Sequence, residues 1–241
     1  MTAVVRLVTV DGPAGGGKTT LGRRLAMTLG LPLVDTGLFY RGVMVAAVRA
    51  GIDASDPGAA GRLAARVRID INTDPAADDD DWSVRVDGDE PGELSRDPRR
   101  ATLLAELSAL PEVRAAVLPA QRRLAAGGAV AVGRDCGTVV FPGAPVKLWL
   151  WASPEERARR RAVQLAAAGV RVDPQELEAE IAGRDLRDAS REVAPLRPAE
   201  DAHMIDSGRL GVEEMVDCAL AICRAAGMVG AAAAGGGSDG G

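Results

Sequence analysis

A glycine-rich stretch near the N-terminus has the residue types and the spacing that suit phosphate binding. It runs Gly12, Pro13, Ala14, Gly15, Gly16, Gly17, Lys18, Thr19, Thr20 and matches the pattern G-x-x-x-x-G-K-[ST]. Glycines let successive backbone N–H groups turn towards phosphate oxygens, and Lys18 adds a charge that can reach the β- and γ-phosphates. The Thr19 hydroxyl can bind the Mg²⁺ that accompanies a nucleoside triphosphate. The stretch therefore predicts a triphosphate site, with Lys18 as a candidate catalytic residue and Thr19 as a metal ligand.

The segments on either side of this loop agree with the prediction. Residues 4–10 are mostly β-branched and apolar, as in a buried parallel strand. Leu21, Leu25 and Leu29 recur at a spacing of four, which is typical of one helix face. The start of that helix would direct its positive dipole at the bound phosphate. Because strand, loop and helix follow in the order that the motif requires, an incidental Gly-rich turn is disfavoured.

Polar residues follow two further predicted strands. The strand at 31–34 ends at Asp35-Thr36-Gly37, and a helix with Tyr40 and Arg41 in its first turns comes next. The strand at 129–132 ends at Gly133, Arg134 and Asp135. Ligands of open α/β sheets bind at the carboxyl ends of strands, so we expect these residues beside the phosphate loop. Two alternatives stay open: a solvated Arg41 on a helix surface, and an Arg134–Asp135 pair that only closes a turn.

Two Arg-rich helices are predicted later in the chain. The first begins at Ser153-Pro154-Glu155-Glu156, with Ser153 as N-cap, and carries Arg157, Arg159, Arg160 and Arg161. Gly169 ends it, and the second helix spans 174–187. A charged run closes this region: Arg184, Asp185, Arg187, Asp188, Arg191. The pattern favours a lid over phosphates at about 153–190, with a solvated charged face as the alternative.

The remaining elements predict the fold class and the domain limits. Residues 67–71 and 82–86 alternate at period two, which indicates a small antiparallel β insertion at about 66–98. The acidic run at 78–81 reads as a solvated turn. Further strands at 146–151 and 202–206 and a closing helix from 212 complete an α/β domain with five parallel strands over residues 1–228. The Gly/Ala-rich tail, 229–241, is expected to be disordered.

Composition narrows the classes of function. A net charge of −5 gives no indication of nucleic-acid or membrane-surface binding. The three cysteines show no metal-like clustering, so reduced thiols and a cytoplasmic location are expected. The chain also lacks the Asn-Lys-x-Asp that reads guanine in GTPases. A small kinase is therefore favoured over a GTP switch.

Four stretches together resemble bacterial cytidylate kinases over about residues 4–225. They are VDGPAGGGKTT, LVDTGLFYRG, GRDCGTVVFPGAPVKLWLWASPEERARRR and RDLRDASREVAPLRPAEDAHMIDS. The resemblance implies a monomeric P-loop NTPase fold with three α/β/α layers, sheet order 2-3-1-4-5 and a three-stranded insertion. It also implies transfer of the ATP γ-phosphate to CMP or dCMP with Mg²⁺. The sequence departs from the family at Val132, where an acid is common, and at Ala105, where some members have a serine; Ser108 is nearby.

The resemblance also implies roles for individual residues. The acceptor phosphate would be held by Arg41, Arg134 and Arg191. The sugar would be contacted by Thr36, Arg184 and Asp188. The cytosine edge would be read by Asp135 and Arg114, and Tyr40 would lie in the same site. Arg157, Arg160 and Arg161 would be lid residues near the transferring phosphate. Two alternatives remain: another nucleoside monophosphate or small-molecule kinase of adenylate- or shikimate-kinase type, and a nucleotide-binding regulator without turnover.

Overall fold

Five parallel strands form the centre of the computed structural model, which describes residues 6–77, 84–95, 97–167 and 169–228. The strands are β1 (Leu7–Asp11), β2 (Leu33–Asp35), β5 (Ala129–Val132), β6 (Val146–Trp151) and β7 (His203–Asp206). Their order across the sheet is β2-β5-β1-β6-β7. Numbered within this sheet alone, the order is 2-3-1-4-5, as predicted. All of β1 is buried because it lies at the centre, between β5 and β6.

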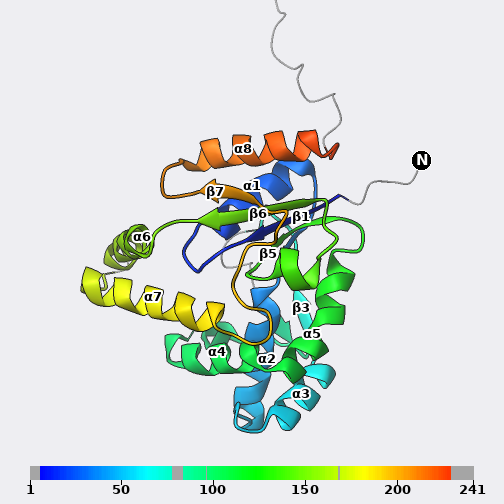
Figure 1. Ribbon diagram of the computed structural model, residues 1–241. Helices are drawn as coiled ribbons and strands as arrows, with labels where there is room; N and C mark the ends of the chain where they lie inside the picture. Colours follow the sequence, from blue (N-terminus) through cyan, green and yellow to red (C-terminus); the bar gives the residue numbers. More distant parts are fainter. Residues whose placement is uncertain (1–5, 78–83, 96, 168, 229–241) are drawn as a thin grey trace, which may run out of the picture.

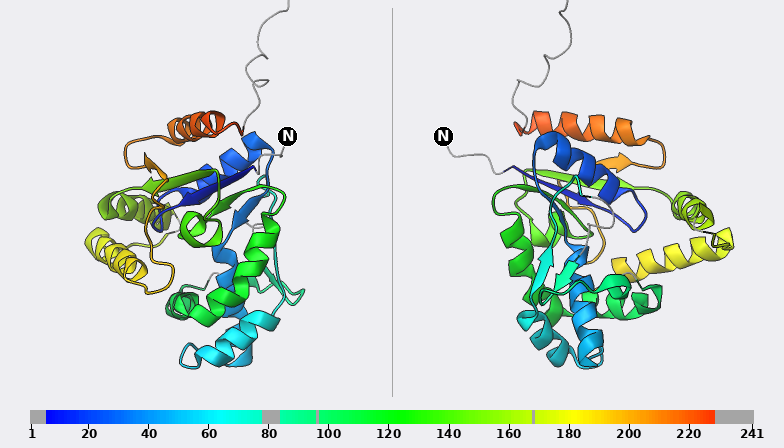
Figure 2. Two further views of the ribbon diagram at one scale, coloured as in Figure 1. Left: turned by 45° about the vertical axis from the view of Figure 1, so that its right-hand side comes forward. Right: turned by 180° about the vertical axis from the view of Figure 1, so that it is seen from behind.

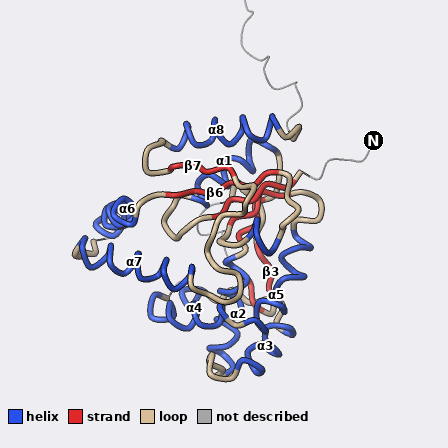
Figure 3. The backbone as a smooth tube through the Cα atoms, in the orientation of Figure 1, coloured by secondary structure: helices blue, strands red, loops and turns tan. Residues whose placement is uncertain are grey.

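Helices cover both faces of this sheet (Figures 1 and 3). On one face lie α1 (Lys18–Leu29) and α8 (Val212–Ala225). Val8 and Val10 point to these two helices and share a core with Leu21 and Leu25, whereas Leu7 packs on the opposite face. The opposite face is covered by α5 (Pro111–Leu124) and by a five-residue π-helix, η3 (Cys136–Val140). This alternation along β1 is the period-two pattern of a strand buried on both faces.

The region between β2 and β5 has its own apolar core. It contains α2 (Gly37–Ala50), α3 (Pro57–Arg66), β3 (Ile69–Ile71), β4 (Val84–Val86), α4 (Ala101–Ala109) and the short helices η1 (Gly92–Ser95) and η2 (Pro98–Arg100). The strands β3 and β4 pair antiparallel, as predicted, and lie apart from the main sheet beside α2 (Figure 2). In the described residues this sheet has two strands, and Asp89 adds only an isolated bridge to Val86. The acidic run at 78–81 and the first residues of the predicted strand at 82–86 lie outside the described residues.

Two long helices project beyond the edge of the sheet. They are α6 (Pro154–Ala167) and α7 (Pro174–Ala189), which lie side by side in all views (Figures 1 and 2). The predicted N-cap of α6 is confirmed, because the backbone N–H of Glu156 donates to Ser153 Oγ at 3.2 Å. Asp173 caps α7 in the same way through the N–H of Gln175. None of the helices in the described ranges has the length and apolar character needed to cross a membrane.

Candidate active site

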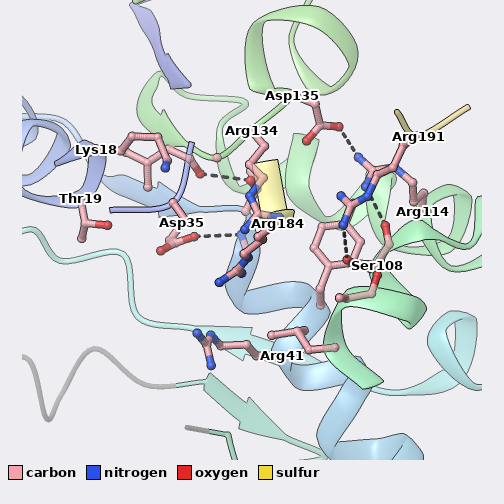
Figure 4. A pocket seen from close by; sticks show the side chains of 18 residues that line it. Lys18, Thr19, Asp35, Arg41, Ser108, Arg114, Arg134, Asp135, Arg184 and Arg191 are labelled. Atoms are coloured by element: carbon pink, nitrogen blue, oxygen red, sulfur yellow. Dashed lines mark hydrogen bonds and ion pairs between the residues drawn. The ribbon is translucent and has the colours of Figure 1, made fainter. Parts of the chain in front are cut away.

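A cavity of about 260 Å³ opens where the phosphate loop meets the carboxyl ends of β2 and β5. Helices α2, α4, α5 and α7 also contribute side chains to it (Figure 4). The loop supplies Ala14, Lys18 and Thr19. Every predicted acceptor residue except Asp188 lines the cavity: Thr36, Tyr40, Arg41, Arg114, Arg134, Asp135, Arg184 and Arg191. The structure therefore brings together residues that are far apart in the sequence, at the edge of the sheet where ligands of such folds bind.

The phosphate loop takes a conformation that requires its glycines. Gly12, Gly15 and Gly17 have φ angles of 147°, 76° and 89°, in the left-handed half of backbone space. A Cβ at Gly12 would lie 2.1 Å from the carbonyl oxygen of Leu150, so the loop packs directly against β6. The loop curls around the side chain of Lys18, whose Nζ donates to the carbonyl of Pro13 at 2.7 Å.

Lys18 is held in surroundings that disfavour its charge. Burial is the largest effect on its pKa, and the nearby guanidinium of Arg134 adds to it, so the pKa falls from 10.5 to about 8. The carboxylates of Asp35 and Asp11 act in the opposite direction. A bound polyphosphate would bring negative charge next to Lys18 and stabilise its charged form. The surroundings of Lys18 therefore suit an anionic ligand.

One corner of the cavity carries a buried ion pair. The guanidinium of Arg114 pairs with Asp135, and both side chains are less than one-tenth exposed. Arg114 also donates from Nη1 to the carbonyl of Ser108 at 2.9 Å and lies 5.2 Å above the ring of Tyr40. These contacts fix the orientation of the Asp135 carboxylate at the cavity wall.

A second corner concentrates positive charge around one carboxylate. Asp188 is 3% exposed and pairs with Arg134 at 2.6 Å and with Arg191 at 2.7 Å. Burial lowers the pKa of Arg134 to about 10, and Asp188 is the main opposing effect. Arg191 also reaches Ser108 Oγ at 3.4 Å, and Arg41 donates to the carbonyl of Ser95 at 2.7 Å. Asp188 thus holds two guanidinium groups at the wall, where planar groups of this kind can clamp a phosphate.

The predicted lid arginines lie outside the cavity. Arg157 is 2% exposed and donates to the carbonyls of Ala152, at 3.0 Å, and Ala14, at 3.1 Å, and it pairs with Asp185. It therefore packs against the phosphate loop and joins it to α7. Arg160 is bound by Glu156 and by the carbonyl of Ser207. Arg161 is exposed and contacts Gln164.

Three residues without a predicted role belong to this site. Asp35 lines the cavity at the end of β2, and Ser108 lines it on α4 while it binds both Arg114 and Arg191. Asp11 lies behind the wall and binds the turn that carries Asp135. The sequence signal for Asp11 and Asp35 was their position at the ends of predicted strands. The only sequence signal for Ser108 was its nearness to Ala105, because its contacts are with Arg114 on α5 and with Arg191 after α7.

The fold and the site define a class of protein. A phosphate-binding loop at the end of a central parallel strand forms one side of an arginine-lined cavity, which is the arrangement of a P-loop phosphotransferase with a small anionic acceptor.

Comparison with known proteins gives the family. The family model described as cytidylate kinase matches residues 8–225. The cytidylate kinase of Pseudomonas paraeruginosa is 43% identical over 92% of this chain and 97% of its own length. That of Vibrio cholerae is 44% identical over 91% of this chain and 96% of its own length. That of Pelotomaculum thermopropionicum is 41% identical over 89% of this chain and 94% of its own. This chain belongs to the cytidylate kinase family, so the predicted family and the predicted kinase activity are confirmed.

Solved structures resemble the chain less closely. TT1252 from Thermus thermophilus aligns with a TM-score of 0.44 and 21% identity, and the match covers 91% of this chain and 96% of that one. That likeness is too weak to support a conclusion about fold or function.

Proposed function

We propose that this protein transfers the γ-phosphate of ATP to CMP or dCMP, giving ADP and CDP or dCDP, in pyrimidine nucleotide metabolism. ATP binds through residues 12–20, and the acceptor occupies the adjacent cavity. The observation that supports this most directly is that one cavity contains Lys18 and Thr19 at one end and the Arg114–Asp135 pair at the other. A nucleoside monophosphate has two ends of matching chemistry: an anionic phosphate, and a base edge that can be read by hydrogen bonds.

The donor side fits Mg²⁺. The Thr19 hydroxyl is exposed, and the carboxylate of Asp35 lines the same cavity, so two oxygen groups of the kind Mg²⁺ prefers are available. Among the described residues there is no group of three or more acidic, His or Cys side chains that would enclose a metal. That donor set suits an ion that takes most of its ligands from substrate phosphates and water. When bound, Mg²⁺ would neutralise charge on the β- and γ-phosphates.

The acceptor side has a group for each part of CMP. Arg41, Arg134 and Arg191 bind the α-phosphate, and Thr36, Arg184 and Asp188 bind the sugar. Asp135 accepts a hydrogen bond from the exocyclic amine of cytosine, a pairing that distinguishes cytosine from uracil. Arg114 and Tyr40 support Asp135 and the base. The hydroxyl of Thr36 donates to the carbonyl of Val132 at 3.0 Å, so its contact with the sugar would be additional to that bond.

The reaction needs no general base, because the attacking oxygen belongs to a phosphate that is already ionised. Catalysis then consists of alignment and neutralisation of charge on the transferring group. Lys18 supplies charge from the phosphate loop. Arg157, Arg160 and Arg161 supply it from α6 when this helix pair, at about 153–190, closes over the substrates and excludes water.

We also propose the domain organisation and the setting in the cell. Residues 1–228 form the kinase domain, with an acceptor-binding insertion at about 66–98. The Gly/Ala-rich tail at 229–241 lies outside the described residues. The protein acts as a monomer in the cytoplasm, without nucleic-acid or membrane partners; its net charge of −5 supports the absence of such polyanionic partners.

An acceptor panel tests the proposed substrate. ADP release is measured with CMP, dCMP, UMP, AMP and shikimate at equal concentrations. CMP and dCMP are expected to give the highest kcat/KM. A higher kcat/KM for AMP or shikimate would overturn the assignment, and ATP binding without ADP release on any acceptor would indicate a regulator instead.

A further inference from the structure

A buried carboxylate links the donor loop to the turn that carries Asp135. Asp11 is the last residue of β1, is 6% exposed and directly precedes Gly12 of the phosphate loop. Its Oδ1 accepts from the backbone N–H of Cys136 at 2.8 Å, and its Oδ2 accepts from that of Gly137 at 2.6 Å. Both oxygens are thus used on consecutive amides at the start of η3. Hydrogen bonds to an ionised acceptor are among the stronger ones in proteins.

We infer that Asp11 is a positioning residue for the acceptor site, which holds the turn bearing Arg134 and Asp135 in register with the phosphate loop. This inference rests on the proposed acceptor roles of Arg134 and Asp135. Those two residues immediately precede the amides that Asp11 binds. The start of this turn is also tied to β1 by the backbone, because the N–H of Gly133 donates to the carbonyl of Val10 at 3.1 Å. Asp11 adds a side-chain anchor beyond Asp135, at the amides of Cys136 and Gly137.

The turn is packed so closely that its position depends on this anchor. A Cβ at Gly133 would lie 2.4 Å from Thr36 Oγ1 and 2.5 Å from Cys136 Sγ. A Cβ at Gly137 would lie 2.9 Å from Thr9 Oγ1 and 3.3 Å from Asp11 Oδ2. The backbone of the turn therefore lies directly against β1 and against Thr36, the residue after β2, because the two glycines leave no side chain between them. A shift of the two amides away from Asp11 would move Asp135 along with them.

An amide at position 11 cannot replace the carboxylate. Asparagine has nearly the same shape, but it offers one accepting oxygen and one NH₂ group. The NH₂ group would face either the N–H of Cys136 or that of Gly137, and two donors would meet. The expected result is displacement of the turn. Displacements of about 1 Å at positioning groups cost on the order of 10²-fold in rate or affinity when the geometry of a site is demanding.

The test compares Asp11→Asn with a matched control on the same strand. Thr9 is fully buried beside the same turn, and its hydroxyl has no hydrogen-bond partner among the described residues. Thr9→Val keeps its shape and removes only that hydroxyl. For each variant, KM for CMP, KM for ATP and kcat are measured together with the melting temperature. Asp11→Asn is expected to raise KM for CMP about tenfold or more and KM for ATP less than about threefold, while Thr9→Val leaves both near wild type.

Two results would overturn the inference. One is an equal rise in KM for ATP and CMP, which would restrict Asp11 to the phosphate loop. The other is a lower melting temperature with both KM values unchanged, which would make its role only structural. If Asp11→Asn does not fold, hydrogen exchange of wild type decides: protected Cys136 and Gly137 amides support the inference, and freely exchanging ones refute it. Failure of the proposed function is a separate outcome, because wild type itself would then not use CMP.

Discussion

Replacement of Asp135 by asparagine is expected to change which base the acceptor site prefers. In the structure Arg114 donates to Asp135. Arg114 has donors only, so it would orient the new side chain with its oxygen towards the guanidinium. The NH₂ group of the introduced asparagine would then face the acceptor. Such a group repels the amine of cytosine and donates to the O4 carbonyl of uracil.

The size of this change follows from the charges involved. A hydrogen bond to a charged group contributes about 1.5–3 kcal/mol, so its loss raises KM for CMP about 10- to 100-fold. Binding of UMP gains a hydrogen bond, so the ratio of kcat/KM for CMP to that for UMP falls by about 100-fold or more. Arg114 loses its counter-charge but keeps the carbonyl of Ser108 and the ring of Tyr40. The folded state should lose about 2–3 kcal/mol, or about 5–10 °C in melting temperature.

The assay is ADP release at saturating ATP with CMP or UMP varied, for wild type and Asp135→Asn. KM for ATP at saturating acceptor serves as the internal control and should change little. A role for Asp135 in reading the base is ruled out if KM for ATP and KM for CMP rise equally while the CMP-to-UMP ratio of kcat/KM stays at the wild-type value. Asp135 would in that case act as a structural partner of Arg114 and not as a reader of the base.

Three further predictions concern the phosphate loop and its anchor. Lys18→Ala should lower kcat on the order of 10²-fold or more, because charge stabilisation of the transferring phosphate is lost; near-normal turnover would contradict this role. Binding of ATP near pH 8 should be accompanied by proton uptake, because the negative phosphates raise the pKa of Lys18 from about 8. Calorimetry in buffers of different ionisation enthalpy measures this uptake, and Lys18→Ala should show none. Burial raises the pKa of Asp11 from 3.8 to about 6, so its contribution to stability is full below about pH 4 and is lost as the pH rises through about 6. The difference in free energy of unfolding between wild type and Asp11→Asn should therefore fall by about 3 kcal/mol from about pH 4 to about pH 6. Parallel pH profiles of the two proteins would argue against a raised pKa of Asp11.

Local sequence patterns were sufficient for most of the framework. The phosphate loop, the five strands and helices α6 and α7 each have a signal within a few residues: glycine spacing, β-branched runs, or a Ser-Pro-Glu-Glu start. The left-handed φ angles of Gly12, Gly15 and Gly17 agree with the reason for which glycines were expected there. Strand ends also indicated where the site would be, because topology fixes that edge of a parallel sheet.

Long-range partners could not be predicted from those patterns. The sequence indicated a lid role for Arg157 but not its partners: its guanidinium is buried against the carbonyl of Ala14 in the phosphate loop and pairs with Asp185. Asp11 bonds to residues 125 and 126 positions further along the chain. The π-helix at 136–140 has no distinctive composition, and its first two amides bind Asp11. Such contacts depend on the packed structure, and local propensity carries no information about them.

Phosphate transfer from ATP to CMP is tested most directly by following the transferred phosphate. Wild type is incubated with CMP and ATP labelled in the γ-phosphate, and the products are separated and identified. We expect the label in the β-phosphate of CDP, in an amount equal to the ADP formed. Label recovered as inorganic phosphate, or in the product of a different acceptor when several are supplied together, would contradict it.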